Sequence, residues 1–211
     1  MKKIIACIPF ARDTIFRHFF FSWSAMLYYA RGRYDLGVTM IYGPYIDANR
    51  DFLISTAMKE NPDYYLFLDD DQVYPENTPE ILMNHIDSGV EIVGGVTPKK
   101  EDAKPMLWDW DGKKINLWND LRGHDGLIKV DGMGLGGVMI APSVFDKLEP
   151  PYFKIDATSR RYRNHGEDIS FYIKCKENGI GAYCDTRLQY GHVMANVIGV
   201  GEHHKSMEAN W

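Results

Sequence analysis

Residues 64–76 read YYLFLDDDQVYPE, an apolar run that ends in three consecutive aspartates, Asp69, Asp70 and Asp71. The apolar part has the length of a strand that is buried on both faces, as in a parallel sheet. Three neighbouring carboxylates at the end of such a strand repel one another unless positive charge lies among them. The stretch therefore predicts a buried strand whose carboxyl end carries a charged site.

Strand and helix patterns alternate on both sides of this stretch. Strands are expected at 3–8, 36–42, 64–68 and 90–95, and helices at 14–31, 47–59 and 77–87, capped by Thr14, Asp47 and Asn77. The alternation is typical of an α/β fold, a mostly parallel central sheet flanked by helices. Ligands of such sheets bind beyond the carboxyl ends of the strands. We therefore expect the loop at 9–13 and the three aspartates to share one cleft.

The second half of the chain is less regular. Residues 100–131, rich in Trp, Asp, Gly and Lys, predict a small antiparallel region with loops. Further elements are expected as strands at 136–142, 180–186 and 188–193, a short helix at 143–148 and an amphipathic helix at 167–178 ended by Gly179. Residues 194–211 form a polar tail, so one domain of 211 residues accounts for the whole sequence.

Composition narrows the class of protein. The net charge of −5 argues against a broad nucleic-acid surface. The three cysteines show no C-x-x-C spacing, which predicts reduced, buried thiols. The apolar N-terminal stretch ends at Pro9, too early for a signal peptide, and polar residues interrupt the aromatic segment 16–29. These features predict a cytoplasmic protein without a membrane span, in the host cytoplasm if the protein is viral.

The aspartate triplet favours a metal site over an acidic turn that only caps the next helix. Carboxylate oxygens at a strand end suit Mg²⁺ or Mn²⁺, which keep open positions for phosphate oxygens. A calcium-binding EF-hand loop is excluded, because its sixth position would need glycine and Tyr74 stands there.

Asp69 to Val73 also fit the D-x-D-x-V pattern of phosphatases that form an aspartyl phosphate. In that alternative Asp69 is the nucleophile and Asp71 the acid/base. Those enzymes usually carry the pattern on their first strand, whereas here it follows the third. The placement makes the phosphatase hypothesis weaker without removing it.

Three other motifs are candidates for chemistry. Glu167 and Asp168 begin a helix, where carboxylates are favoured by the helix dipole and simply cap it, or where Asp168 acts as a general base. The segment GMGLGG at 132–137 either allows close backbone approach to a ligand or forms a flexible loop. His192 is either a structural residue or a metal ligand.

Together these motifs resemble those of GT-A fold glycosyltransferases, in particular small phage and prokaryotic members. The resemblance extends over roughly residues 3–193, with a nucleotide-binding half at about 1–98 and an acceptor half at about 99–193. It rests on segments in a fixed order: KKIIACIPFARD, the strand with DDD, VEIVGGVTPKK, GMGLGGVMIAPSVFDKL and HGEDISFYIKCKENGIGAYCDTRLQYGH.

The resemblance implies a role for each matching position. Asp71 and His192 would bind the metal, and Asp168 would be the catalytic base, with Glu167 holding donor or acceptor. The nucleotide would contact Pro9, Phe10, Arg12, Asp13, Arg50, Asp69 (at the ribose) and Asp70 (with no defined role), and Lys99, Lys100 and Lys205 would approach its phosphates. The acceptor side would include Trp108, Gly136, Gly137 and Arg163, with Trp110 and Trp118 as further aromatic residues.

The resemblance thus implies a metal-dependent glycosyltransferase that uses a nucleoside-diphosphate sugar, with uridine as the expected base. The expected cofactor is Mn²⁺ or Mg²⁺, and the acceptor is a saccharide hydroxyl or a modified nucleobase in DNA. Transfer is expected to invert the anomeric centre. Two alternatives stay open beside it, the phosphatase and a non-catalytic module that binds nucleotide sugars.

Overall fold

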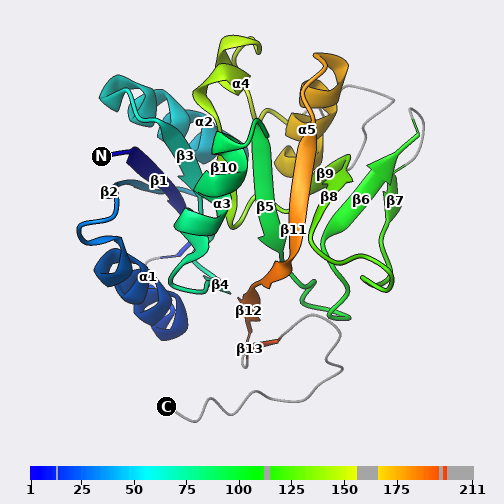
Figure 1. Ribbon diagram of the computed structural model, residues 1–211, viewed down its shortest axis with the longest axis horizontal. Coiled ribbons are helices and arrows are strands. Elements are labelled where there is room, and N and C mark those ends of the chain that lie inside the picture. Colours follow the sequence, from blue (N-terminus) through cyan, green and yellow to red (C-terminus); the bar gives the residue numbers. More distant parts are fainter. Residues whose placement is uncertain (13, 112–114, 156–165, 195–196, 199–211) are drawn as a thin grey trace.

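The computed structural model describes residues 1–211 except 13, 112–114, 156–165, 195–196 and 199–211 (Figure 1). Its centre is a seven-stranded sheet in the order β2-β1-β3-β10-β5-β11-β8. The strands are β1 (Lys3–Phe10), β2 (Asp35–Tyr42), β3 (Tyr64–Phe67), β5 (Ile92–Val96), β8 (Leu127–Val130), β10 (Val138–Ile140) and β11 (Ala182–Gln189). Strand β1 pairs in parallel with β2 and β3, and β5 pairs in parallel with β11, whereas β10 and β8 are antiparallel to their neighbours. The predicted α/β fold with a mostly parallel sheet is confirmed.

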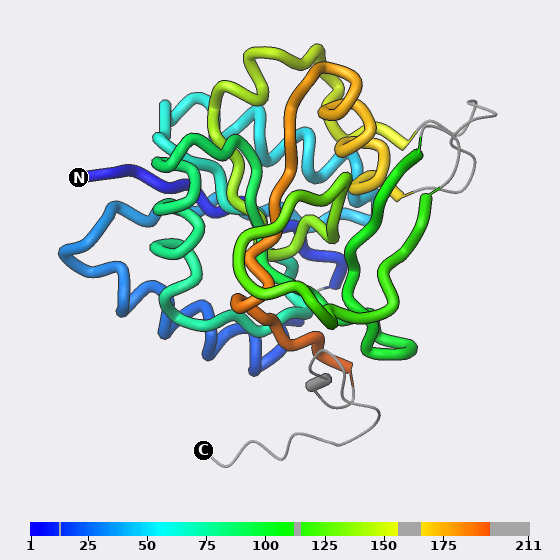
Figure 2. Tube along the Cα trace, turned by 45° about the vertical axis from the view of Figure 1, so that its right-hand side comes forward, coloured from blue at the N-terminus to red at the C-terminus, as the bar shows by residue number. Residues whose placement is uncertain are grey.

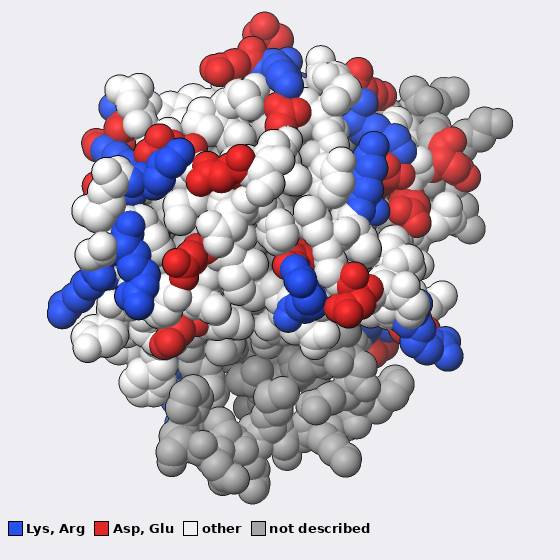
Figure 3. Space-filling view, in the orientation of Figure 1, with Lys and Arg blue, Asp and Glu red and all other residues white. Residues whose placement is uncertain are grey.

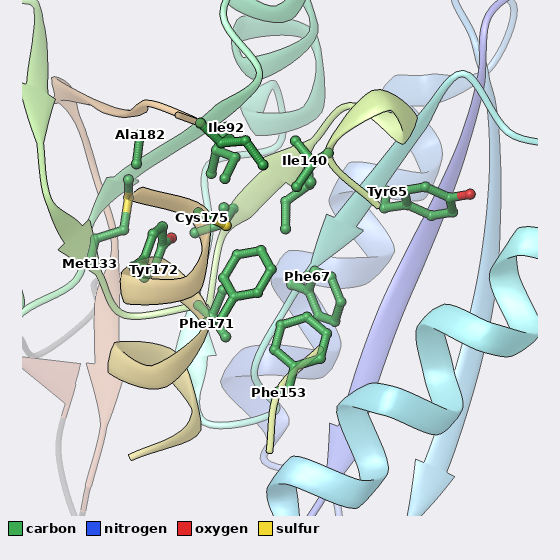
Figure 4. Packing of buried hydrophobic residues seen from close by; sticks show 14 of the residues in the cluster. Tyr65, Phe67, Ile92, Met133, Ile140, Phe153, Phe171, Tyr172, Cys175 and Ala182 are labelled. Atoms are coloured by element: carbon green, nitrogen blue, oxygen red, sulfur yellow. The ribbon is translucent and has the colours of Figure 1, made fainter. Parts of the chain in front are cut away.

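Helices cover both faces of the sheet. On one face α1 (Arg17–Ala30) and α3 (Thr78–Asp87) share an apolar cluster with Ile4, Ala6 and Ile8 of β1. On the other, α2 (Ile46–Ala57), α4 (Pro142–Asp146) and α5 (Glu167–Glu177) share a second apolar cluster with Ile5 and Cys7 of β1, and Figure 4 shows part of it around Phe67, Phe153 and Phe171. A short 3₁₀ helix, η1 (Met58–Glu60), follows α2. Because successive residues of a strand point to opposite faces, the apolar run of β1 serves both cores.

Two small sheets complete the architecture. One consists of β7 (Ile115–Leu117), β6 (Leu107–Trp110) and β9 (Gly132–Met133), all antiparallel, which matches the antiparallel region predicted at 100–131. The other contains β13 (Val197–Ile198), β12 (Gly191–Val193) and β4 (Gln72–Val73). In it His192 lies opposite Gln72. Figure 2 shows the chain leaving β11 and turning into β12, and this turn brings His192 beside the aspartates.

The expected halves of the chain interleave in the central sheet. Strand β10, from the second half, lies between β3 and β5 of the first half. The pairing is antiparallel on both sides, which the apolar run at 136–142 could not reveal because its composition is the same in either direction.

Two of the three predicted helix caps are wrong. The N-cap positions of α1 and α2 are Phe16 and Tyr45, not Thr14 and Asp47, and neither side chain makes a capping hydrogen bond. Asp47 lies in the first turn of α2, where its charge is favoured by the helix dipole. Asn77 occupies the N-cap position of α3 but makes no side-chain cap.

The predictions for Gly179 and for the cysteines are confirmed. Gly179 follows α5 with φ of +74°, a left-handed conformation that glycine adopts without steric cost. All three cysteines are free and buried. In the described part of the chain no helix has both the length and the apolar character needed to cross a membrane.

Candidate functional site

A cleft of about 410 Å³ lies at the carboxyl ends of β1 and β3. The aspartate triplet, the start of α5 and the strand β12 all contribute to its wall. The lining residues are Pro9, Ala11, Arg12, Ile46, Arg50, Asp69, Asp70, Asp71, Gln72, Lys99, Lys100, Glu101, Met106, Gly134, Leu135, Glu167, Asp168 and His192. The sequence-based expectation that the loop after β1 and the aspartates share one cleft is therefore confirmed.

Each aspartate of the triplet faces its own basic side chain. Asp69 binds Arg50 at 2.8 Å and Asp71 binds Lys100 at 2.6 Å. Asp70 lies 3.7 Å from Arg12. The repulsion expected among three adjacent carboxylates is thus offset by three separate cations that come from different parts of the sequence.

Arg50 connects the end of β3 to the start of α5. Its side chain is 3% exposed, and it donates from Nη2 to Asp69 at 2.8 Å and from Nε to Glu167 at 3.2 Å. Burial would lower the pKa of this guanidinium, but the two carboxylates raise the pKa above its usual value. The backbone N–H of Asp69 donates to the hydroxyl of Tyr74 at 2.8 Å, which fixes the strand end further. Asp69 and Glu167 are therefore held in place by a buried charge.

Asp70 is the least solvated member of the triplet. It is 5% exposed, and burial raises its pKa to about 6, although the charge of Arg12 opposes this shift. Its Oδ2 has no hydrogen-bond partner within the described chain. The guanidinium of Arg12 lies 4.3 Å from the ring centroid of Phe16, which places it at the entrance of α1. The pair is thus an ion pair without a hydrogen bond.

Asp71 and His192 face each other across the cleft, with Oδ1 of the carboxylate and Nε2 of the ring 3.6 Å apart. Nδ1 of His192 lies 2.8 Å from the carbonyl oxygen of Pro98, which can only accept, so Nδ1 carries the proton. In the neutral ring Nε2 then has a free lone pair, and it lies 3.6 Å from Oδ1 of Asp71. Burial would raise the pKa of Asp71, but contacts with His192 and Lys100 hold the pKa below its usual range.

This pair fits a divalent ion. A bond from Mg²⁺ to oxygen is about 2.1 Å long, so one ion between the two atoms can reach both. A carbonyl that fixes the second ring nitrogen is the usual support of a metal-binding histidine. The described residues contain no group of three His, Cys, Asp or Glu side chains placed to hold a metal. Asp71 and His192 alone would leave the remaining positions of the ion open to ligand and water.

Asp168 has the environment of a general base. It lies in the first turn of α5, where its Oδ1 accepts a hydrogen bond of 2.7 Å from the N–H of Ile169. Burial and the neighbouring charge of Glu167 raise its pKa to about 6. A carboxylate with such a pKa accepts a proton near neutral pH better than an ordinary aspartate does.

Most of the predicted site residues converge on the cleft. Those that line it are Pro9, Arg12, Arg50, Asp69, Asp70, Asp71, Lys99, Lys100, Glu167, Asp168 and His192. Gly136 lies behind Asp69, since a Cβ there would come within 2.7 Å of Oδ2. Gly137 has φ of +78° and packs against the ring of Tyr190. Asp13, Arg163 and Lys205 lie outside the described residues.

Two predicted site residues lie elsewhere. Phe10 is absent from the cleft wall and packs edge-on against Phe19 under α1. Trp108 is 2% exposed and packs edge-on against Tyr172, so it belongs to the core and not to an acceptor wall. Leu107 and Trp108 are both buried at the start of β6. The loop-rich sequence did not show which of its tryptophans face the core. Trp110 and Trp118 do not line the cleft either.

Sequence reasoning missed Gln72 and Pro98. The buried amide of Gln72 accepts from the hydroxyl of Thr97 at 3.1 Å and donates to Asp69 at 3.4 Å. Its position directly after the aspartates was a usable signal. The carbonyl of Pro98 acts through the backbone, so no residue type could have indicated its role.

Comparison with known proteins is informative for the fold only. No family model and no curated protein matches the sequence. Among solved structures the chain is similar to A197 from STIV, with 16% sequence identity and a TM-score of 0.66. The similarity covers 100% of both chains. It shows a shared fold from end to end.

Proposed function

We propose that this protein is a metal-dependent glycosyltransferase of the GT-A type that moves a sugar from a nucleoside-diphosphate sugar to an acceptor hydroxyl. The observation that carries the proposal is the pair formed by Asp71 and His192, whose Oδ1 and Nε2 atoms lie 3.6 Å apart while the carbonyl of Pro98 fixes the ring. The same cleft holds a carboxyl suited to act as a base, Asp168. A metal site and a base in one cleft are what transfer from a diphosphate donor needs.

Asp71 and His192 would hold Mn²⁺ or Mg²⁺, which would supply neutralising charge for the diphosphate leaving group. Lys99 and Lys100 line the same part of the cleft and add positive charge for the phosphates. The carboxylates alone would repel a diphosphate, so these cationic groups are required for the donor to bind.

Asp69 is proposed to bind the ribose of the nucleotide. A carboxylate accepts hydrogen bonds from vicinal hydroxyls, and Arg50 holds this one rigidly at the end of β3. Arg12, at the cleft wall, is proposed to contact the nucleotide on the β1 side. Uridine is the proposed base, as the resemblance of the sequence implies.

Asp168 is proposed to take the proton of the acceptor hydroxyl as that oxygen attacks the anomeric carbon. The bond from this carbon to the diphosphate oxygen breaks, and the electron pair leaves with the diphosphate. Attack from the face opposite the leaving group inverts the anomeric centre. Arg50 positions both Glu167, beside the base, and Asp69, on the donor side.

The acceptor is proposed to be a saccharide, with a modified nucleobase in DNA as the second candidate. Lys and Arg side chains are interspersed with Asp and Glu over the face shown in Figure 3. This distribution and the net charge of −5 favour an uncharged acceptor over a nucleic acid.

Two other hypotheses give different outcomes. In an aspartyl-phosphate phosphatase Asp69 would be the nucleophile, but Arg50 engages one of its oxygens and Gln72 approaches the other. A module that only binds nucleotide sugars would need no carboxyl whose pKa is raised to about 6, as that of Asp168 is. Both arguments favour the transferase.

The proposal is tested by release of UDP from UDP-sugars, measured with Mn²⁺ and with chelator. A transferase requires the metal and loses at least 100-fold in turnover in Asp168→Asn. Hydrolysis of p-nitrophenyl phosphate that Asp69→Asn abolishes would instead indicate the phosphatase. Tight UDP binding without any turnover would indicate the binding module.

A further inference from the structure

Lys100 forms an ion pair with Asp71, the carboxylate that is proposed to bind the metal. Its Nζ lies 2.6 Å from Oδ2 of Asp71, and the lysine side chain is 34% exposed. The other oxygen, Oδ1, faces Nε2 of His192 at 3.6 Å. One carboxylate thus carries a cation on one oxygen and is proposed to receive a second cation on the other.

We propose that Lys100 and the divalent ion compete for Asp71, and that the diphosphate of the donor ends the competition by giving Lys100 a new anionic partner. This inference rests on the proposed function of the cleft. An ammonium group and a divalent ion on one carboxylate repel each other, so each weakens the binding of the other. A diphosphate has oxygens enough to contact both cations at once.

The local structure allows the lysine to move while the histidine stays in place. Lys100 has a flexible side chain that is partly exposed at the cleft wall. The turn that carries it is closed by backbone hydrogen bonds, from Lys99 N–H to the carbonyl of Lys104 at 2.8 Å and from Ala103 N–H to that of Lys99 at 3.1 Å. Pro98, in the same segment, fixes His192. The exchange therefore needs only a side-chain rotation.

The consequence is ordered binding. The metal alone binds weakly because Lys100 on the same carboxylate repels it, and it binds tightly once the nucleotide gives Lys100 another anionic partner. By thermodynamic linkage the metal strengthens nucleotide binding by the same factor. Lys100 would thus keep the affinity of the cleft for free divalent ions low.

The test is a titration of the wild type, Lys100→Gln and Lys99→Gln with Mn²⁺ alone. Electron paramagnetic resonance measures the free Mn²⁺ at each step. Lys99 is the matched control, because it lines the same cleft but makes no ion pair within the described residues. Lys100→Gln should bind Mn²⁺ about tenfold more tightly than the wild type, in the usual range of coupling between sites. Lys99→Gln should change the affinity for Mn²⁺ by less than about half of this tenfold factor. Circular dichroism checks that both variants are folded.

A second titration measures UDP, and then GDP, in saturating Mn²⁺. Lys100→Gln should bind the nucleotide less tightly than the wild type, so its coupling between metal and nucleotide shrinks. If Lys100→Gln binds Mn²⁺ no more tightly than the wild type, or if Lys99→Gln gains equally, the competition is refuted while the metal site stands. If no variant binds Mn²⁺ with or without nucleotide, both the inference and the proposed metal-dependent function fail.

Discussion

Arg50 binds Asp69 at 2.8 Å with its side chain only 3% exposed to solvent. The same guanidinium donates to Glu167 at 3.2 Å. One buried cation therefore joins the strand end on the donor side to the helix that carries the base. Both carboxylates are partly buried, with side chains 24% and 13% exposed, and the buried guanidinium would be strongly disfavoured without them.

Arg50→Met should lower the free energy of unfolding by about 3–5 kcal/mol, the usual cost of removing one partner of a buried ion pair. Equilibrium unfolding in urea measures the loss. Arg12→Met is the matched control, because Arg12 is 33% exposed and lies 3.7 Å from its carboxylate without a hydrogen bond. A loss in Arg50→Met that does not exceed the loss in Arg12→Met would contradict the bridging role.

Gly136→Ala should weaken nucleotide binding. A Cβ at this position would lie 2.3 Å from Nε2 of Gln72 and 2.7 Å from Oδ2 of Asp69, so the proposed ribose ligand must shift. Calorimetry with UDP and Mn²⁺ should show a loss of about tenfold, since a displaced hydrogen bond to a charged group is worth about 1.5–3 kcal/mol. Gly134→Ala is the control, because its Cβ would meet only the flexible end of Met106 at 3.3 Å. Equal affinities in the two variants would show that Asp69 does not contact the nucleotide.

Asp168→Asn should make the protein more stable at neutral pH. The pKa of Asp168 is raised from 3.8 to about 6, because burial and Glu167 disfavour its charged form. Between these two pKa values the folded protein holds a proton that the unfolded chain releases, so this group lowers the free energy of unfolding as pH rises through that window. This decrease in the free energy of unfolding is complete above about pH 6 and absent below about pH 4.

Urea unfolding of the wild type and Asp168→Asn near pH 4 and near pH 7 measures the effect. The variant should be more stable by on the order of 1 kcal/mol at the higher pH, and equal to the wild type at the lower one. The same variant should lose turnover, since the amide accepts no proton. A difference in stability that does not change with pH would show that Asp168 titrates normally in the folded protein.

The sequence was sufficient to predict the sheet, its helices and the edge at which the cleft lies. The apolar runs at 3–8 and 64–68 are long and bounded, and the carboxyl ends of parallel strands necessarily meet at one edge. Only the resemblance to GT-A glycosyltransferases implied that Asp71 and His192 belong to one site, and in the structure the two side chains lie 3.6 Å apart. Neither the pairing of β4 with β12, which brings them together, nor the antiparallel insertion of β10 has a local signal.

The partners of the aspartates could not be predicted from the sequence. Positive charge among Asp69, Asp70 and Asp71 was expected, but it was assigned to a metal ion. In the structure each aspartate pairs with a basic residue from a distant part of the sequence. No local pattern indicates which basic residue this is. Trp108 was assigned to an acceptor wall because a tryptophan in a loop-rich segment has the same composition whether it lies in a core or on a surface.

The metal dependence of nucleotide binding tests the central proposal most directly. Calorimetric titration of UDP is compared in Mn²⁺ and in chelator, for the wild type, Asp71→Asn and Asp102→Asn. Asp102 is the control, since it forms an exposed pair with Lys104 outside the cleft wall. We predict that the wild type and Asp102→Asn bind UDP only with Mn²⁺, and that Asp71→Asn loses at least about tenfold, the cost of one strong charged contact. Equal UDP affinity in chelator and in Mn²⁺, or an unchanged affinity in Asp71→Asn, would contradict a metal held by Asp71 and His192.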